Sequence, residues 1–201
     1  MNQEDESVDE IVDDHASWTR VGGGSHDETL VETWLFRLRK ERFRSRKSGA
    51  CHDYFVTHLA DGVHVIALTA DGRVVMVRQF RAGAGRDSLE TPGGLIEPGE
   101  DPLVAGAREL LEETGYAGQG ARLISTLFPN PALLSMRIST IVITDVIAIA
   151  PPRPDANEEL TIELVPARSI APLIQEGLID HAVCVAGLLQ WVAGEGGEAK
   201  G

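Results

Sequence analysis

The sequence has few cysteines and few positively charged residues. Only Cys51 and Cys184 are cysteines among 201 residues, and neither belongs to a Cys-x-x-Cys pair. This favours two reduced thiols over a disulfide framework or a zinc site. Lysine and arginine number 18 against 31 acidic residues, giving a net charge of −13. Such a chain repels phosphate, which argues against binding to DNA or RNA, so a phosphate-handling site would need metal or local arginines.

Long hydrophobic runs are also missing. The longest, near 141–151, is interrupted by Thr144 and Asp145 and is too short to cross a membrane. The first residues are acidic, without the basic region and apolar core of a signal peptide. A hydrophobic content of 43% is ordinary for a globular chain. We therefore expect a cytoplasmic protein with no membrane partner.

Composition divides the chain into four segments. The first is acidic and contains no lysine or arginine, so it cannot bury enough apolar surface to become ordered. We expect a mobile acidic tail at 1–16, an N-terminal antiparallel strand region at 17–60, the main domain at 61–193 and a frayed C-terminus at 194–201. Within the second segment, residues 33–44 alternate between apolar and polar side chains, which indicates a strand.

Strands and helices interleave in the main domain. Residues 63–68 and 74–77 flank an Asp71-Gly72 turn and predict a β-hairpin. The remaining predicted elements are strands at 123–127, 139–149 and 160–165, and helices at 167–176 and 181–192. No regular βαβ repetition is present. The α/β (α+β) class, with a mixed central sheet between helices, fits best.

A glycine turn at residues 93–94 leads into a further predicted helix. Asp101 is placed to cap it and Pro102 to begin it, and Gly115 is placed to end it. Helical spacing predicts an inner face of Leu103, Ala107, Leu110 and Leu111. It predicts the opposite face to carry Glu109, Glu112 and Glu113.

Carboxylates crowded on one helix face repel one another, so a cation between them would explain the pattern. Oxygen ligands without histidine or cysteine indicate Mg²⁺ or Mn²⁺. These ions bridge phosphate oxygens and activate water. A solvated acidic helix face is the alternative.

The segment from Gly94 to Tyr116 resembles the signature of the Nudix hydrolases, G-x5-E-x7-R-E-U-x-E-E-x-G-U, in which U is apolar. Every fixed position matches, with Tyr116 in the last place. Further segments are similar to the ADP-ribose pyrophosphatase branch of that family, namely 77–81, 89–94, 157–159 and 176–181.

This resemblance implies the Nudix fold and a set of metal ligands. Glu109 and Glu113 would be the principal ligands, and Glu112 and the carbonyl group of Gly93 would share the ion. The residues that would brace the loop and helix are Gly94, Glu100, Arg108 and Gly115. Glu158 would be the general base, with Glu159 as its neighbour, unless both are ordinary loop acids.

The resemblance also implies substrate contacts. Arg81 would meet the phosphates, with Arg78 and Glu90 from the same segments beside the site; a surface strand charge is the alternative for Arg81. In this branch the strands around Trp34 often exchange between subunits, which would make the protein a homodimer. A core position for Trp34 is the other possibility.

The implied reaction is metal-dependent hydrolysis of a nucleoside diphosphate sugar, above all ADP-ribose to AMP and ribose 5-phosphate. Residues 129–137 depart from the branch because they lack its usual glycine and glutamate. GDP-mannose or another nucleotide sugar is therefore an alternative substrate. A non-catalytic ADP-ribose-binding regulator is a further alternative, although such proteins typically lose the glutamates of the signature, which this chain retains.

Overall fold

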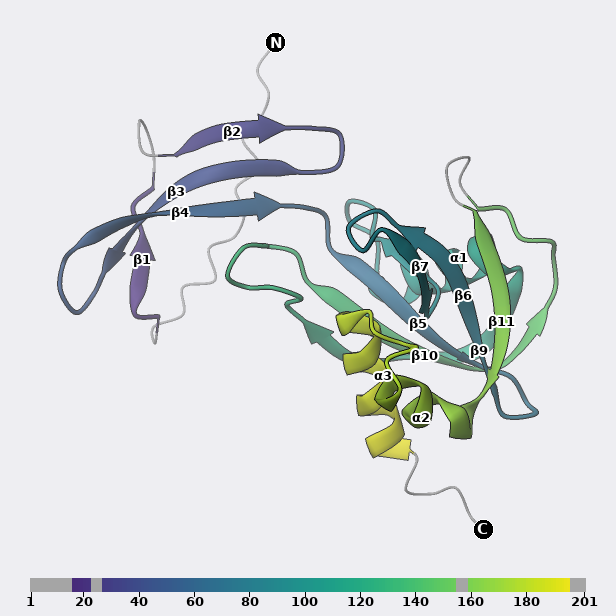
Figure 1. Cartoon of the computed structure of the whole chain (residues 1–201). Coiled ribbons are helices and arrows are strands. Elements are labelled where there is room, and N and C mark those ends of the chain that lie inside the picture. The colour runs from purple at the N-terminus through teal and green to yellow at the C-terminus, as the bar shows by residue number, and fades with distance from the viewer. Residues whose placement is uncertain (1–15, 23–26, 155–158, 196–201) are drawn as a thin grey trace. The chain divides into compact units, whose positions relative to one another are not determined.

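The computed structural model describes residues 16–22, 27–154 and 159–195, which form two compact units with a boundary between His58 and Leu59 (Figure 1). The predicted acidic tail lies outside the described residues except for Ala16, and so does the predicted C-terminus beyond Glu195.

The N-terminal unit is an antiparallel sheet. Its strands are β1 (Trp18–Arg20), β2 (Glu28–Glu32), β3 (Arg37–Ser45) and β4 (Cys51–His58). Strand β3 is central and pairs with all three others. Its basic side chains are matched across the sheet, as in the Arg42–Asp53 ion pair at 2.6 Å, which explains how so basic a strand is accommodated.

The predicted strand at 33–44 begins only at Arg37. The hydroxyl oxygen of Thr33 accepts hydrogen bonds from the backbone N–H groups of Leu35 and Phe36, which closes a turn before the strand. Trp34 lies in this turn and is 93% exposed. It therefore has no core position within the described chain.

The second unit is built on a seven-stranded mixed sheet. Its strands are β5 (Gly62–Leu68), β6 (Arg73–Arg81), β7 (Arg86–Glu90), β8 (Gly93–Leu95), β9 (Tyr116–Leu127), β10 (Ile138–Ala148) and β11 (Leu160–Pro166). The order is β11-β6-β5-β10-β9, with β7 beside β6 and β8 beside β5. Only the β5–β10 pair among these strands is parallel. The predicted mixed sheet is confirmed.

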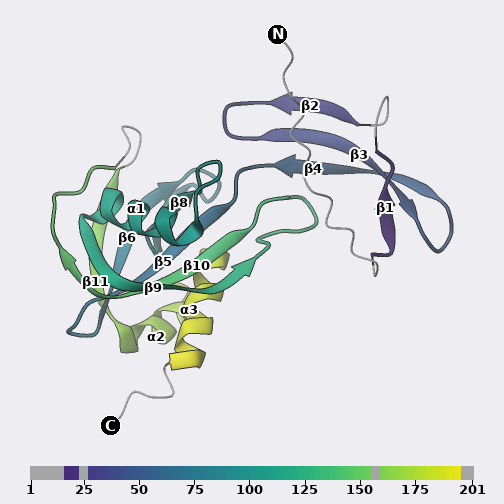
Figure 2. The same ribbon diagram turned by 180° about the vertical axis from the view of Figure 1, so that it is seen from behind.

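Helices cover both faces of this sheet, as the two views show (Figures 1 and 2). Helix α1 (Pro102–Thr114) lies on one face; α2 (Ile170–Gln175), which follows a short 3-10 turn, and α3 (Ala182–Glu195) lie on the other. No helix within the described ranges has both the length and the apolar character needed to cross a membrane.

Alternation along β5 connects the sheet to the two hydrophobic cores. Val63 and Val65 pack with Leu110 of α1, whereas Ile66 packs with Leu188 of α3. All five side chains are almost fully buried. Burial of each contributes on the order of 1.5–3 kcal/mol, so β5 is fixed firmly between the helices.

The sequence did not predict β7 or β8. The latter is only three residues long and begins with two glycines, so it has no apolar alternation. It pairs with β5 through Gly93 opposite His64 and Gly94 opposite Val63. A Cβ at position 93 would lie 2.1 Å from the carbonyl oxygen of Val63, so this close pairing requires glycine.

Candidate active site

Strand β8, a short loop and α1 form a continuous strand–loop–helix segment. A side-chain oxygen of Asp101 accepts a hydrogen bond from the backbone N–H of Leu103 at 2.8 Å, which caps the start of α1. Gly115 ends the helix in the left-handed conformation with φ of 72°, and its N–H donates to the carbonyl of Leu111. These ends are the ones the sequence predicts.

The inner face of α1 differs from the prediction. Ala107 and Leu111 are exposed, whereas Ala105, Gly106 and Glu113 are buried. The helix approaches the sheet through its small residues, because a Cβ at position 106 would lie only 2.8 Å from Ile141 Cδ1. The prediction assumed that the large apolar side chains define the buried face of the helix. It therefore assigned Glu113 to the exposed face.

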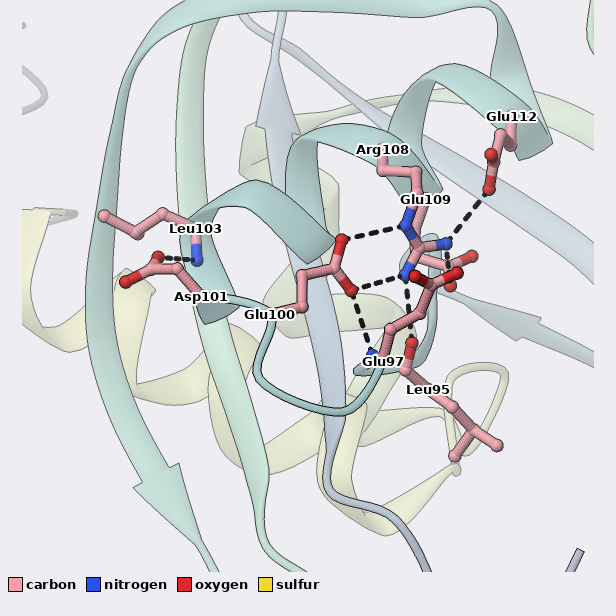
Figure 3. Close-up of polar contacts among 8 residues, drawn as sticks. All are labelled: Leu95, Glu97, Glu100, Asp101, Leu103, Arg108, Glu109 and Glu112. Atoms are coloured by element: carbon pink, nitrogen blue, oxygen red, sulfur yellow. Dashed lines mark hydrogen bonds and ion pairs between the residues drawn. The ribbon is translucent and has the colours of Figure 1, made fainter.

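Arg108 is the centre of the polar cluster beside α1 (Figure 3). Its guanidinium donates two hydrogen bonds to Glu100, at 3.0 and 2.9 Å. It also donates to Glu109 at 2.9 Å, to Glu112 at 3.1 Å and to the carbonyl oxygen of Leu95 at 3.1 Å. One planar cation therefore connects the helix to the loop and to β8.

Glu100 completes the loop. One of its carboxylate oxygens accepts a hydrogen bond from the backbone N–H of Glu97 at 3.0 Å, in addition to its bonds from Arg108. The hydrogen bonds from Arg108, followed by that from Glu97, lower the pKa of the Glu100 carboxyl. Glu100 is thus ionised at neutral pH and acts as the acceptor that fixes the loop.

The three predicted metal ligands on α1 differ in exposure. Glu113 is only 2% exposed, and its Oε2 accepts a hydrogen bond from the backbone N–H of Gly93 at 3.0 Å. The Glu109 side chain is 14% exposed and that of Glu112 is 49% exposed. The carboxylates of Glu109 and Glu113 both reach the glycines of β8, so the cluster extends from a buried inner end to solvent.

The donor set of this cluster fits a hard divalent cation. It offers carboxylate oxygens from Glu109, Glu112 and Glu113 and a backbone carbonyl from Gly93, with Arg108 as the basic partner of the first two. Mg²⁺ and Mn²⁺ prefer oxygen ligands of this kind. In this structure Arg108 and the Gly93 N–H hold the carboxylates, so all three already have polar partners.

A second ion pair lies on the neighbouring strands β6 and β7. Arg81 donates two parallel hydrogen bonds to Glu90, at 2.9 and 2.8 Å, and Glu90 has no exposed surface. Burial raises the pKa of Glu90, but the hydrogen bonds and charge of Arg81 outweigh burial and lower it overall. The pKa of Arg81 is raised mainly by Glu90 and slightly by the charge of Glu113.

Other predicted site residues are placed differently. Arg78 pairs with Glu163 on β11 at 2.6 Å. Trp34 belongs to the N-terminal unit. Glu158 lies outside the described residues, and its neighbour Glu159 is exposed. The structure therefore brings together the residues of the loop and α1, and separately Arg81 and Glu90.

Sequence reasoning missed a cluster formed by His64, Thr91, His181 and Cys184. Cys184 Sγ lies 3.4 Å from His64 Nδ1 and 3.2 Å from His181 Nδ1, and Thr91 Oγ1 lies within hydrogen-bond distance of His64 and Cys184. Burial lowers the pKa of His64 to about 4 and raises the pKa of Cys184 to about 12. His181 and Cys184 are three residues apart, but His64 lies 120 residues from Cys184, so the sequence does not show that the three meet.

Known proteins resemble this chain in both sequence and fold. The ADP-ribose pyrophosphatase of Mycobacterium tuberculosis is 29% identical over 166 residues, covering 81% of this chain and 79% of that protein. The ADP-sugar pyrophosphatase of Mus musculus is 41% identical over 71 residues, covering 35% of this chain and 33% of that protein. A crystal structure of an ADP compounds hydrolase superposes with a TM-score of 0.75 at 22% identity, covering 90% of this chain and 97% of that chain.

The decisive match is to the family model of the NUDIX domain, which spans residues 58–184. That range contains β5 to β11, α1 and the glutamate cluster. The match and the shared fold confirm the resemblance seen in the sequence. The chain belongs to the Nudix family and is a Nudix hydrolase.

Proposed function

We propose that this protein hydrolyses the diphosphate bond of ADP-ribose, releasing AMP and ribose 5-phosphate, in the cytoplasm. The observation that carries the proposal is the cluster of Glu109, Glu112 and Glu113 around Arg108, against the glycines of β8. The similarity of the chain to an ADP-ribose pyrophosphatase and to an ADP-sugar pyrophosphatase supports the substrate class.

Glu109, Glu112, Glu113 and the carbonyl group of Gly93 would hold Mg²⁺ or Mn²⁺. When bound, the ion supplies water activation and neutralises the charge that develops on the diphosphate. Arg108 and Glu100 fix the loop against the helix, so the carboxylates are positioned before substrate arrives. Gly94 leaves room for the carboxylate of Glu109.

Arg81 binds the negatively charged diphosphate in this proposal. Its side chain is 41% exposed, and the fully buried Glu90 accepts the two hydrogen bonds that hold its guanidinium in place. Glu90 is thus a positioning residue that acts through Arg81. An arginine held this way loses little entropy on binding and keeps its charge, which counteracts the negative field of the whole chain.

The general base is proposed from the loop before β11. Glu158 is the first choice and Glu159, which is exposed, is its neighbour. Replacement of each by glutamine, assayed with saturating metal, distinguishes them. The assignment predicts that Glu158→Gln lowers kcat and that Glu159→Gln retains it.

A homodimer is proposed from the N-terminal sheet. The N-terminal unit exposes the apolar side chains of Val31, Trp34 and Phe55, at 43%, 93% and 53%, which a second copy could cover. A second copy that covers them would bring Trp34 to the partner's site. Light scattering tests the mass, and Trp34→Ala is expected to raise the KM for ADP-ribose; a monomer of wild-type activity contradicts the dimer.

A substrate panel tests the proposed reaction directly. ADP-ribose, GDP-mannose, UDP-glucose and dGTP are each incubated with enzyme and Mg²⁺, and the products are separated and identified. ADP-ribose is expected to show the largest kcat/KM and to yield AMP. A larger kcat/KM for GDP-mannose would make that nucleotide sugar the substrate in place of ADP-ribose. GDP-mannose is the second candidate because the loop at 129–137 departs from the ADP-ribose branch.

A regulator that binds without turnover is the remaining alternative. Calorimetry that detects tight ADP-ribose binding, together with no product in the assay, would overturn the enzymatic proposal. All of the glutamates of the cluster are present in the chain, which supports turnover.

A further inference from the structure

Three side chains that commonly bind transition metals gather on the α3 face of the second unit. His64 comes from β5, Cys184 from the first turn of α3, and His181 from the residue just before that helix. Their ligand atoms all lie within 4.8 Å of one another. His64 and Cys184 are buried, and the His181 side chain is 35% exposed.

The separations approach those of a tetrahedral zinc site. Zinc lies about 2.3 Å from thiolate sulfur and about 2.0–2.1 Å from imidazole nitrogen, so the sulfur and nitrogen atoms should be about 3.6 Å apart. Here Cys184 Sγ lies 3.4 Å from Nδ1 of His64 and 3.2 Å from Nδ1 of His181. The two imidazole nitrogens would be about 3.3 Å apart in such a site, and here they lie within 4.8 Å of each other.

A buried carboxylate stands close to one of the three. Glu90 Oε2 lies 3.8 Å from His181 Nδ1, and Arg81 keeps this buried carboxyl group ionised. Two imidazoles and a sulfur form a donor set that suits Zn²⁺ and Co²⁺, with a water molecule or this carboxylate to complete the coordination. A hard ion such as Mg²⁺ prefers an all-oxygen set.

This cluster is separate from the glutamates of α1. Side chains of neighbouring residues on β5 point to opposite faces of the sheet: Val63 and Val65 pack on the α1 side, while His64 contacts Cys184 of α3. The exposed edge of His181 offers an approach from solvent.

We infer that His64, His181 and Cys184 form a second metal site that takes zinc or a similar thiophilic divalent cation and connects β5 to the start of α3. Neither cysteine forms a disulfide in this structure, and within the described ranges the metal-ligand group contains Cys184 and not Cys51. The sequence argues against zinc because it shows no Cys-x-x-Cys pair, whereas the folded chain assembles the ligands from distant positions.

Cobalt substitution tests the site without any measurement of turnover. The full-length, metal-stripped protein is titrated with Co²⁺ in excess Mg²⁺, which occupies oxygen sites. The expected result is one Co²⁺ per chain with a thiolate-to-cobalt charge-transfer absorption, displaced by Zn²⁺. Cys184→Ser should abolish that absorption, and Cys51→Ser should retain it.

A second variant, His181→Gln, tests the site in case Cys184→Ser fails to fold. The His181 side chain is partly exposed, so its replacement disturbs the core little. The variant should fold with an unchanged circular dichroism spectrum and bind Zn²⁺ more than about tenfold more weakly than wild type. Zn²⁺ should also raise the Tm of wild type more than that of His181→Gln at the same concentration. Absence of the thiolate absorption in wild type, its persistence in Cys184→Ser, or a loss of zinc affinity below tenfold in His181→Gln overturns the inference.

Discussion

Glu109 lies against Gly94 so closely that a Cβ at position 94 would be 2.5 Å from Oε1 of Glu109. The glycine therefore sets where this carboxylate can rest. Since the atoms it would meet belong to the end of a flexible side chain, a methyl group there would displace the carboxylate and leave the backbone in place.

Gly94→Ala is accordingly expected to fold normally and to need about tenfold more Mg²⁺ for half-maximal activity. A metal titration of initial rate measures this. Gly194→Ala is the matched control, because a Cβ there meets no atom within 4 Å. An unchanged metal requirement in Gly94→Ala would show that Glu109 takes no part in holding the ion.

Glu113→Gln is expected to lower kcat while the fold persists. Glutamine keeps the volume and can still accept the hydrogen bond from Gly93 N–H, but it lacks the charge that binds metal. The loss should reach at least about 10- to 100-fold, the effect of weaker changes around metal ligands. Glu97→Gln, the same chemical change at an exposed position on the loop before α1, should retain activity.

Gly115→Ala is expected to lower the free energy of unfolding. A φ of 72° costs alanine about 1–2 kcal/mol. In addition, its Cβ would lie 2.0 Å from the carbonyl oxygen of Ala150, which must move away. Urea denaturation measures the total.

Gly177→Ala isolates the second contribution in that experiment. Gly177 has φ of 70°, but a Cβ there meets no atom within 4 Å. Gly115→Ala should therefore be the more destabilised of the two; equal losses would mean that the contact with Ala150 relaxes freely.

Glu90→Gln is expected to raise the KM for ADP-ribose more than it lowers kcat. It removes the charge that holds Arg81 through two hydrogen bonds, so the guanidinium loses its fixed orientation. Steady-state kinetics separates the two constants. Asp71→Asn is the control, because it removes the carboxylate of the exposed ion pair with Arg73 and should change neither KM nor kcat. A fall in kcat alone for Glu90→Gln would argue against a positioning role of Glu90.

Local patterns predicted local structure well. Asp101 and Gly115 mark the ends of α1 through capping chemistry, which depends only on neighbouring residues. The spacing of arginine and glutamates likewise indicated the cluster around Arg108.

Features that depend on tertiary contacts were out of reach. Helix α1 turns Glu113 inward because Gly106 lets the helix approach the sheet, a close contact that counting large apolar residues cannot reveal. Strand β8 forms because Gly93 pairs with His64. His64 and Cys184 lie 120 residues apart in the chain and meet only after the sheet and α3 are assembled.

Gly115 fixes both ends of a junction. Its N–H closes α1, while its carbonyl oxygen accepts hydrogen bonds from the N–H groups of Ile149 and Ala150, which directly follow β10. One residue inserted into α1 would rotate the side chains that follow it by about 100°, and this anchored junction leaves no slack to absorb the shift. Length variation among natural relatives should therefore accumulate in the loops and spare the stretch between Glu100 and Gly115, so a multiple alignment would show that stretch free of gaps.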